Sequence, residues 1–280
     1  MTHPSTETPQ QTTYGEILAL QITRGQQELD RRSDGLLLSA LAAGLDMGFG
    51  PLLMAVMLTI ASGVYAQPLT DILLANLYSI GFIIIVLGRS ELFTEHTALA
   101  VFPVLDGRGS LRDLGRLWGL VFIGNVVGSA IFAGFAVSFA PSHLVDPAAF
   151  TALAMTYTTQ SAWPLFAGAL LAGWLMGLLT WLIAAAQDTL GRVFFVWLIT
   201  ASISFAHFPH CIAGTVEVLM GMFVSPAITP LDYGRFLLFS VVGNAIGGTV
   251  FVAVLRYSHV VRSDEDPGSV IEDEETSQEE

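Results

Sequence analysis

Long apolar stretches separated by short polar connections make up most of the chain. They lie at about 36–64, 72–103, 115–139, 162–187, 194–224 and 234–256. A bilayer core requires about 20 apolar residues in a helix. The pattern therefore predicts an all-α integral membrane protein with six transmembrane helices at 36–256. A polar N-terminal arm at 1–35 precedes them and a polar tail at 257–280 follows.

Polar residues interrupt two of these stretches near their middle. The second contains Arg89, Glu91 and Glu95, and the fifth contains His207 and His210. Each stretch has about 30 residues, which is too long for one span. Lipid cannot hydrogen bond to free backbone groups, so irregular backbone at membrane depth is buried in protein or lines a polar cavity. We expect spans two and five to be broken helices beside a pathway.

The arginines orient these spans. All eleven basic residues are arginine, and six spans place nine of them on one side and Arg235 on the other. The positive-inside rule assigns the arginine-rich side, and with it both termini, to the cytoplasm. We therefore expect a multi-pass protein of the inner (plasma) membrane with cytoplasmic ends.

Composition narrows the functional class. The chain is 53% hydrophobic and 12% charged, with a mean hydropathy of +0.64. These values are unlike those of a cytosolic enzyme or a nucleic-acid-binding protein. The net charge of −13 arises mostly in residues 264–280, which hold nine acidic residues and no basic one. We expect that tail to be disordered and solvated, with a docking role as the alternative.

The motif G-N-x-x-G-x-x-x-F occurs twice, at 124–132 and at 243–251, in the third and sixth spans. Small residues at this spacing are common wherever membrane helices pack closely. Their recurrence at matching positions, each shortly after a broken span, predicts two inverted three-helix repeats. Asn125 and Asn244 need partners inside the membrane. We expect them to tie span ends to the unwound segments, with direct substrate contact as the alternative.

Half-helices that begin at membrane depth point partial positive charge at a pathway. Thr94 or Ser90 is the predicted cap of the second half of span two. Pro209 suits the first turn of the second half of span five, where its missing N–H is not needed. Two such N-termini facing one another would favour the binding of a small anion between them.

Titratable residues near the breaks are the candidates for chemistry. His210 and His207 can donate a hydrogen bond to an anion when neutral, or exchange a proton with it. Buried histidines bonded to backbone carbonyls are the alternative. Asp46 and Glu217 are single intramembrane acids, which face either a subunit interface or a vestibule.

Arg89, Glu91, Glu95 and His96 form a second charged group at the first break. We interpret it as a network in which an arginine among carboxylates holds the loop. A gating or proton-relay role is the alternative.

These residues resemble the formate/nitrite transporter family over about 36–256. The resemblance rests on Leu92, Phe93 and Thr94 at the first break, on F-P-H-C-I-A at 208–213, and on G-N-V-V-G at 124–128. It implies an aquaporin-like protomer, a homopentamer with one pore per subunit, and passage of small monovalent anions or their acids.

The same resemblance assigns positions along the pore. His210 matches the family's central histidine, and Thr94 matches the threonine of the unwound loop. The remaining residues implied to line the pathway or its constrictions are Leu92, Phe93, Tyr78, Phe82, Ile203 and Thr180.

Several positions depart from the family pattern. Gly177 stands where the family usually has an asparagine, and Ser161 or Gln160 stands near its usual lysine. Pro209 replaces the acidic residue that commonly precedes the central histidine, and Arg89 is unusual. The chain resembles a divergent branch whose substrate these changes leave open.

The leading hypothesis is transport of small monovalent anions such as formate, nitrite, acetate or hydrosulfide, with protons as an optional partner. The alternatives are a facilitator for a small neutral solute and a non-transporting sensor or scaffold. With no HExxH or paired-cysteine motif and a single cysteine, we expect no enzyme activity, no metal and no cofactor.

Overall fold

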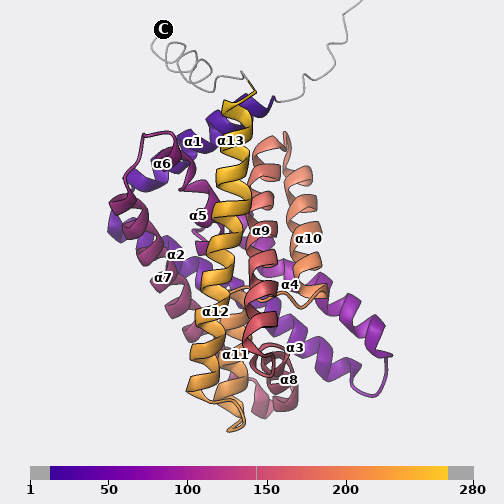
Figure 1. The fold of residues 1–280 in the computed structure, drawn as a ribbon. Helices are drawn as coiled ribbons and strands as arrows, with labels where there is room; N and C mark the ends of the chain where they lie inside the picture. Colours follow the sequence, from indigo (N-terminus) through magenta and orange to yellow (C-terminus); the bar gives the residue numbers. More distant parts are fainter. Residues whose placement is uncertain (1–12, 143, 264–280) are drawn as a thin grey trace, which may run out of the picture.

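The computed structural model describes residues 13–142 and 144–263, and regular structure in this part of the chain is helical (Figure 1). The predicted acidic tail at 264–280 and the first twelve residues of the arm lie outside it. In chain order the elements are α1 (Tyr14–Asp30), α2 (Ser33–Met47), α3 (Phe49–Ala61), α4 (Gln67–Gly88), α5 (Phe93–Leu99), α6 (Phe102–Leu105), α7 (Leu111–Val137), η1 (Ala140–Ser142), α8 (Pro147–Thr158), α9 (Ala162–Ala185), α10 (Thr189–Phe205), α11 (Ala213–Val224), α12 (Pro230–Gly248), η2 (Thr249–Val254) and α13 (Leu255–Val261).

Within the described residues, five helical segments are long and apolar enough to cross a membrane. They are Ser33–Ala61, Gln67–Gly88, Leu111–Val137, Ala162–Ala185 and Pro230–Val261. The fifth predicted stretch is instead divided between two shorter apolar helices, α10 with 17 residues and α11 with 12. The second stretch is divided unevenly, because α4 has 22 residues and α5 only 7.

The two interruptions begin with the same backbone turn. Arg89 after α4 and His207 after α10 have φ of 55° and 53°, in the left-handed region. The N–H of Ser90 donates to Ile85 O (3.1 Å) and the N–H of Phe208 to Ile203 O (3.0 Å). Such bonds satisfy carbonyls left free at a helix C-terminus. Both helices therefore end by a defined reversal of the chain.

Two helix pairs form the closest contacts of the bundle: α2 with α7, and α9 with α12. Glycine permits the approach in each. Gly44 on α2 touches the backbone of Asn125 on α7, and Gly173 on α9 touches the backbone of Asn244 on α12. A Cβ at either glycine would overlap a carbonyl oxygen of the partner helix. These contacts set the positions of the two asparagines relative to the breaks.

Within the N-terminal arm predicted at 1–35, residues 14–30 form the helix α1. Thr13 and Glu16 form a capping box: the Glu16 N–H donates to Thr13 Oγ1 (3.2 Å) and the Thr13 N–H to Glu16 Oε2 (2.6 Å). Leu18 and Ile22 are fully buried. In Figure 1, α1 lies near α6 and α13 at one end of the molecule, and its contacts include both. Its apolar stripe was missed because polar residues surround it in the sequence.

We predict that Gly44→Ala and Gly173→Ala each lower the melting temperature of the detergent-solubilised protein. Glycine to alanine within a helix normally stabilises by about 0.5–1 kcal/mol. Here the added methyl group collides with a backbone carbonyl, and overpacking of this kind costs about 1–3 kcal/mol. Gly35→Ala on α2, where a Cβ meets nothing within 4 Å, is the control and should not lower the melting temperature. Equal melting temperatures for all three variants would contradict this account of the packing.

Candidate pore constriction

His210 lies in the second break, residues 206–212, directly before α11. Its Nδ1 accepts hydrogen bonds from the backbone N–H groups of Ile212 (3.3 Å) and Ala213 (3.2 Å). Its Nε2 is 2.8 Å from Thr94 Oγ1. Because Nδ1 is an acceptor, we assign the proton of the neutral ring to Nε2, which then donates to Thr94. The Thr94 hydroxyl keeps its own hydrogen for a further acceptor.

Thr94 stands in the first turn of α5, so the hydrogen bond to His210 joins the N-terminal ends of two short helices. The N–H of Phe93 at the start of α5 donates to Asn125 Oδ1, and the N–H of Cys211 before α11 donates to Asn244 Oδ1, each at 2.8 Å. The two N-termini converge, as the sequence predicted, but these N–H groups are already bonded. The hydroxyl of Thr94 is therefore the polar group best placed to meet a ligand.

Each asparagine makes the same set of hydrogen bonds at its break. Asn125 Nδ2 donates to Ala40 O and Glu91 O, both at 2.8 Å. Asn244 Nδ2 donates to Ala169 O (2.7 Å) and Pro209 O (3.0 Å). One amide thus spans two helices and an unwound segment in each half. Both side chains are fully buried, and each holds an unwound segment with its amide oxygen and its amide nitrogen.

The predicted caps of the two short helices are wrong. Leu92 is the N-cap of α5 without a side-chain bond, and Asn125 from α7 replaces the expected Thr94 or Ser90. Pro209 precedes α11 by four residues, and the imidazole of His210 caps that helix instead. Local sequence favoured nearby hydroxyls, but a side chain from another helix and a histidine perform the task.

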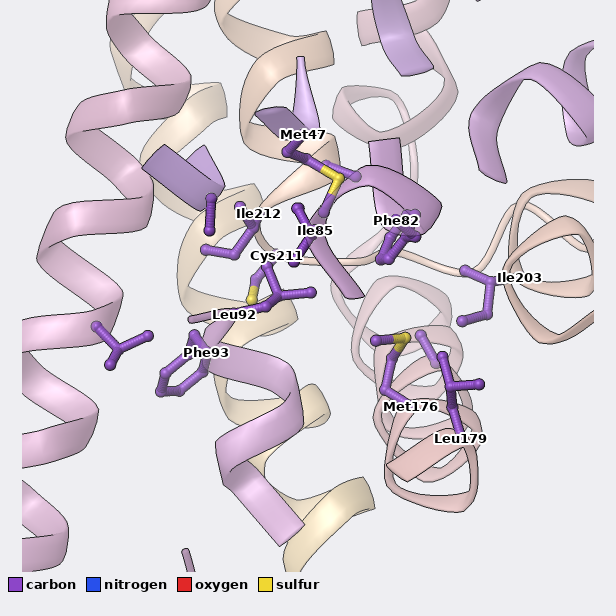
Figure 2. Close-up of a cluster of buried hydrophobic side chains, with 14 of the residues drawn as sticks. Met47, Phe82, Ile85, Leu92, Phe93, Met176, Leu179, Ile203, Cys211 and Ile212 are labelled. Carbon is purple, nitrogen blue, oxygen red and sulfur yellow. The ribbon is translucent and has the colours of Figure 1, made fainter. Parts of the chain in front are cut away.

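A cluster of buried apolar side chains from several elements includes Phe82, which packs against the histidine, and the two residues that follow it, Cys211 and Ile212. The ring of Phe82 on α4 meets His210 edge-on at 5.0 Å between centroids, and Tyr78 lies 5.1 Å from Phe82. The buried cluster drawn in Figure 2 includes Met47, Phe82, Ile85, Leu92, Phe93, Met176, Leu179, Ile203, Cys211 and Ile212. Water is largely excluded here, which strengthens each hydrogen bond that is made.

The other residues assigned to the pathway by resemblance have different surroundings. Phe93 packs against Trp118 and Phe122, at 6.0 and 5.3 Å between ring centroids, and so belongs to the contact with α7. Thr180 donates its hydroxyl to Gly177 O within α9 (2.7 Å). Ile203 is fully buried in the apolar cluster.

Gly177, in the family's asparagine position, touches the side chain of Val252. A Cβ built at Gly177 would lie 2.7 Å from Val252 Cγ2. The close approach of α9 and η2 therefore leaves no room for a larger residue unless Val252 moves. Ser161 is an exposed N-cap of α9 and makes no capping bond.

An arginine does hold Glu91, but it is Arg31 at the end of α1 and not Arg89. The Arg31 guanidinium pairs with Glu28 (2.8 Å) and with Glu91. Burial lowers the pKa of Arg31, yet its hydrogen bond to Glu28 and the charge of Glu91 outweigh this and raise the pKa above its usual value. Arg89 is exposed and has no ion pair within the described chain.

His96 completes this network, because its Nε2 lies 2.7 Å from Glu91 Oε2. Glu95 does not join this hydrogen-bond network. Its Oε1 is buried and has no hydrogen-bond partner among the described residues. Glu28, Glu91 and His96 are also close enough to share a metal ion. The Arg31 guanidinium binds both carboxylates and stands where a cation would be needed, so we assign no metal there.

A small cavity of about 30 Å³ lies on the α8 side of the constriction. His207, which is exposed and not a buried histidine, lines this cavity together with Glu217. Asp71 and Tyr157 also line it and were not singled out from the sequence, because an acid at a helix start and a tyrosine in a connecting helix carry no distinctive signal.

Comparisons with known proteins agree with this architecture. A sequence model described as "Formate/nitrite transporter" matches residues 15–258. The inner membrane protein YfdC of Escherichia coli is 32% identical over 245 residues, covering 84% of this chain and 75% of YfdC. The nitrite transporter NirC of Escherichia coli is 27% identical, covering 79% of this chain and 81% of NirC.

Solved structures show the same fold. An "FNT family ion channel" superposes with a TM-score of 0.77 at 23% identity, covering 88% of this chain and 98% of that one. A pentameric formate channel with formate bound gives 0.70 at 22% identity, covering 82% and 98%. With the family model covering most of the sequence, the chain belongs to the formate/nitrite transporter family.

Proposed function

We propose that the protein conducts small monovalent anions of the formate and nitrite type, or their conjugate acids, through a pore in each protomer controlled by His210. The observation that carries the proposal is the buried hydrogen bond between His210 Nε2 and Thr94 Oγ1, which joins two helix N-termini inside an apolar cluster. Relatives named as nitrite and probable formate transporters support the substrate class.

Six spans in two inverted repeats, arranged as in aquaporins, are part of this proposal. α10 and α11 together then form the span that neither makes alone. The matching left-handed turns at Arg89 and His207 and the matching bonds of Asn125 and Asn244 support the repeat. An even number of spans, with the arginine distribution, puts both termini in the cytoplasm.

The hydrogen-bond order at the constriction suggests how an anion is accepted. Nε2–H of His210 donates to Thr94 Oγ1, and the Thr94 O–H then donates to an anionic oxygen in the pore. Donors in such a chain polarise one another, and the effect is greater where water is excluded. The partial positive charge of the two helix N-termini adds to this field. A full charge at membrane depth costs at least about 3 kcal/mol, so a conjugate acid passes more easily.

Protonation of His210 would disturb the fold locally. The free position is Nδ1, which accepts the N–H groups of Ile212 and Ala213. A proton there would replace two accepted hydrogen bonds by repulsion from the N-terminus of α11. The neutral histidine is thus the resting form.

A homopentamer is the assembly we propose, because the formate channel of the same fold is pentameric. The exposed large apolar side chains, among them Ile123, Ile131 and Phe135 on α7, would then face lipid or neighbouring subunits.

A facilitator for a small neutral solute is the second candidate. His210 is neutral at rest, and the sequence contains no lysine, so neither a charged histidine nor a lysine attracts an anion to the pathway.

We expect wild-type protein in proteoliposomes to show saturable flux of formate, nitrite or acetate that rises as the pH falls from 8 to 5. In His210→Ala the flux should fall across this whole pH range, because the Nε2–H group that donates to Thr94 Oγ1 is gone. His259→Ala on α13, away from the constriction, should behave as wild type. Absence of flux above that of empty liposomes for all three anions would overturn the proposal.

The Thr94 hydroxyl is expected to be required for anion flux. Thr94→Val keeps the shape but removes the donor, and the loss of about one hydrogen bond to a charged group, worth about 1.5–3 kcal/mol, predicts a fall in formate flux of tenfold or more. Thr94→Ser should retain most of the flux. Similar flux in the valine and serine variants would show that the hydroxyl does not contact the anion.

A further inference from the structure

The cavity on the α8 side of the constriction contains a buried acid that the proposed pathway has not used. Residues from six parts of the chain enclose this space: α3, α4, α8, the end of α10, the break after it, and α11. In Figure 1 these elements meet in the half of the molecule away from α1 and α13. About 30 Å³ accommodates one or two water molecules or a part of a small ligand.

Glu217 is the buried acid. Its side chain is 1% exposed, and its Oε1 has no hydrogen-bond partner within the described residues. An ionised carboxylate in such a place lacks the pairing that offsets loss of water, whereas a protonated carboxyl group is neutral. Glu217 is therefore a carboxylic acid at rest, and the cavity is the space open to its O–H.

Besides Glu217, the titratable residues that line the cavity are Asp71, Tyr157 and His207, and Tyr78 on α4 also lies near Glu217. Asp71 on α4 is held by Gln67, whose Nε2 donates to Asp71 Oδ1 (2.7 Å). Tyr157 comes from α8, and His207, exposed at the break, connects the cavity with the solution. The phenol of Tyr157 does not release its proton near neutral pH, and the Asp71 carboxylate is already held by the Gln67 amide. His207 is thus the group suited to return a proton to Glu217.

We propose that Glu217 is a proton-donating subsite for small monocarboxylate anions entering from the α8 side. The inference rests on the proposed transport function and adds a residue to it. In the step, the O–H of Glu217 hydrogen bonds to the carboxylate oxygen of the anion. The proton passes to that oxygen, the neutral acid moves on, and Glu217 is left as a carboxylate. A proton from the solution, carried by His207, restores it.

The position of Glu217 suits such an order of events. It lies on α11 seven residues after His210, and α11 begins at Ala213. Four residues of helix span about 6 Å. A molecule neutralised at Glu217 therefore has a short way to the apolar constriction, where charge is least tolerated.

The test compares formate with formamide, a neutral molecule of similar size, in proteoliposomes containing the full-length protein and a pH-sensitive dye. Initial rates are measured between pH 5 and 8 for wild type, Glu217→Gln, Glu217→Asp and Asp34→Asn. Asp34 is an exposed carboxylate paired with Arg32 at the far end, so Asp34→Asn controls for the carboxylate-to-amide change.

In Glu217→Gln we expect formate flux at pH 7 and the accompanying proton entry to fall by about 10- to 100-fold, the range of a general acid at its lower end. Formamide flux should be unchanged, and Glu217→Asp should recover part of the formate flux. Infrared spectra of wild type at pH 7 should show the carbonyl band of a protonated carboxyl group that is missing in Glu217→Gln.

Three results would overturn the proposal. They are unchanged formate flux and proton entry in Glu217→Gln, parallel loss of formate and formamide flux, or no protonated-carboxyl band. Parallel loss would show a structural role for Glu217. Wild-type protein without flux of formate, nitrite or acetate would refute the transport function itself. That measurement on wild type separates this outcome from failure of the Glu217 proposal.

Discussion

Backbone amides that leave a helix inside a membrane must find partners in the protein, and this requirement shapes the centre of the molecule. Asn125 and Asn244 meet it at the two breaks, each binding an unwound segment through its oxygen and nitrogen. They reach those segments only because glycines at 44 and 173 let the helices approach. The packing of α2 with α7 and of α9 with α12 is therefore inseparable from the shape of the breaks.

The hydrogen bonds of His210 depend on these asparagine contacts. With the chain held at Cys211, His210 turns its ring over the start of α11 and accepts two backbone N–H groups. This fixes which ring nitrogen faces Thr94. A histidine that caps its own helix can act as a donor toward Thr94 without carrying charge, as an apolar surrounding requires.

The first break has a further support that links it to the N-terminal helix. Arg31 reaches Glu91 across 60 residues of sequence, and Arg116 donates to the carbonyls of Leu29 and Arg31. His96 binds the same carboxylate. α1 is thereby attached to the segment that carries Leu92 and Thr94, so its place in the molecule bears on the pore and not only on the surface.

Hydropathy alone located the apolar stretches, and polar residues within them located both interruptions, because lipid tolerates neither charges nor free backbone groups. The repeated G-N-x-x-G motif identified the two asparagines before any contact was known. The caps of the short helices and the arginine that holds Glu91 were decided by tertiary structure. Each depends on side chains far apart in sequence, where local propensity carries no information. The place of Glu217 beside a cavity is of the same kind, since only the packing of α4, α8 and α11 determines which face of a helix meets that cavity.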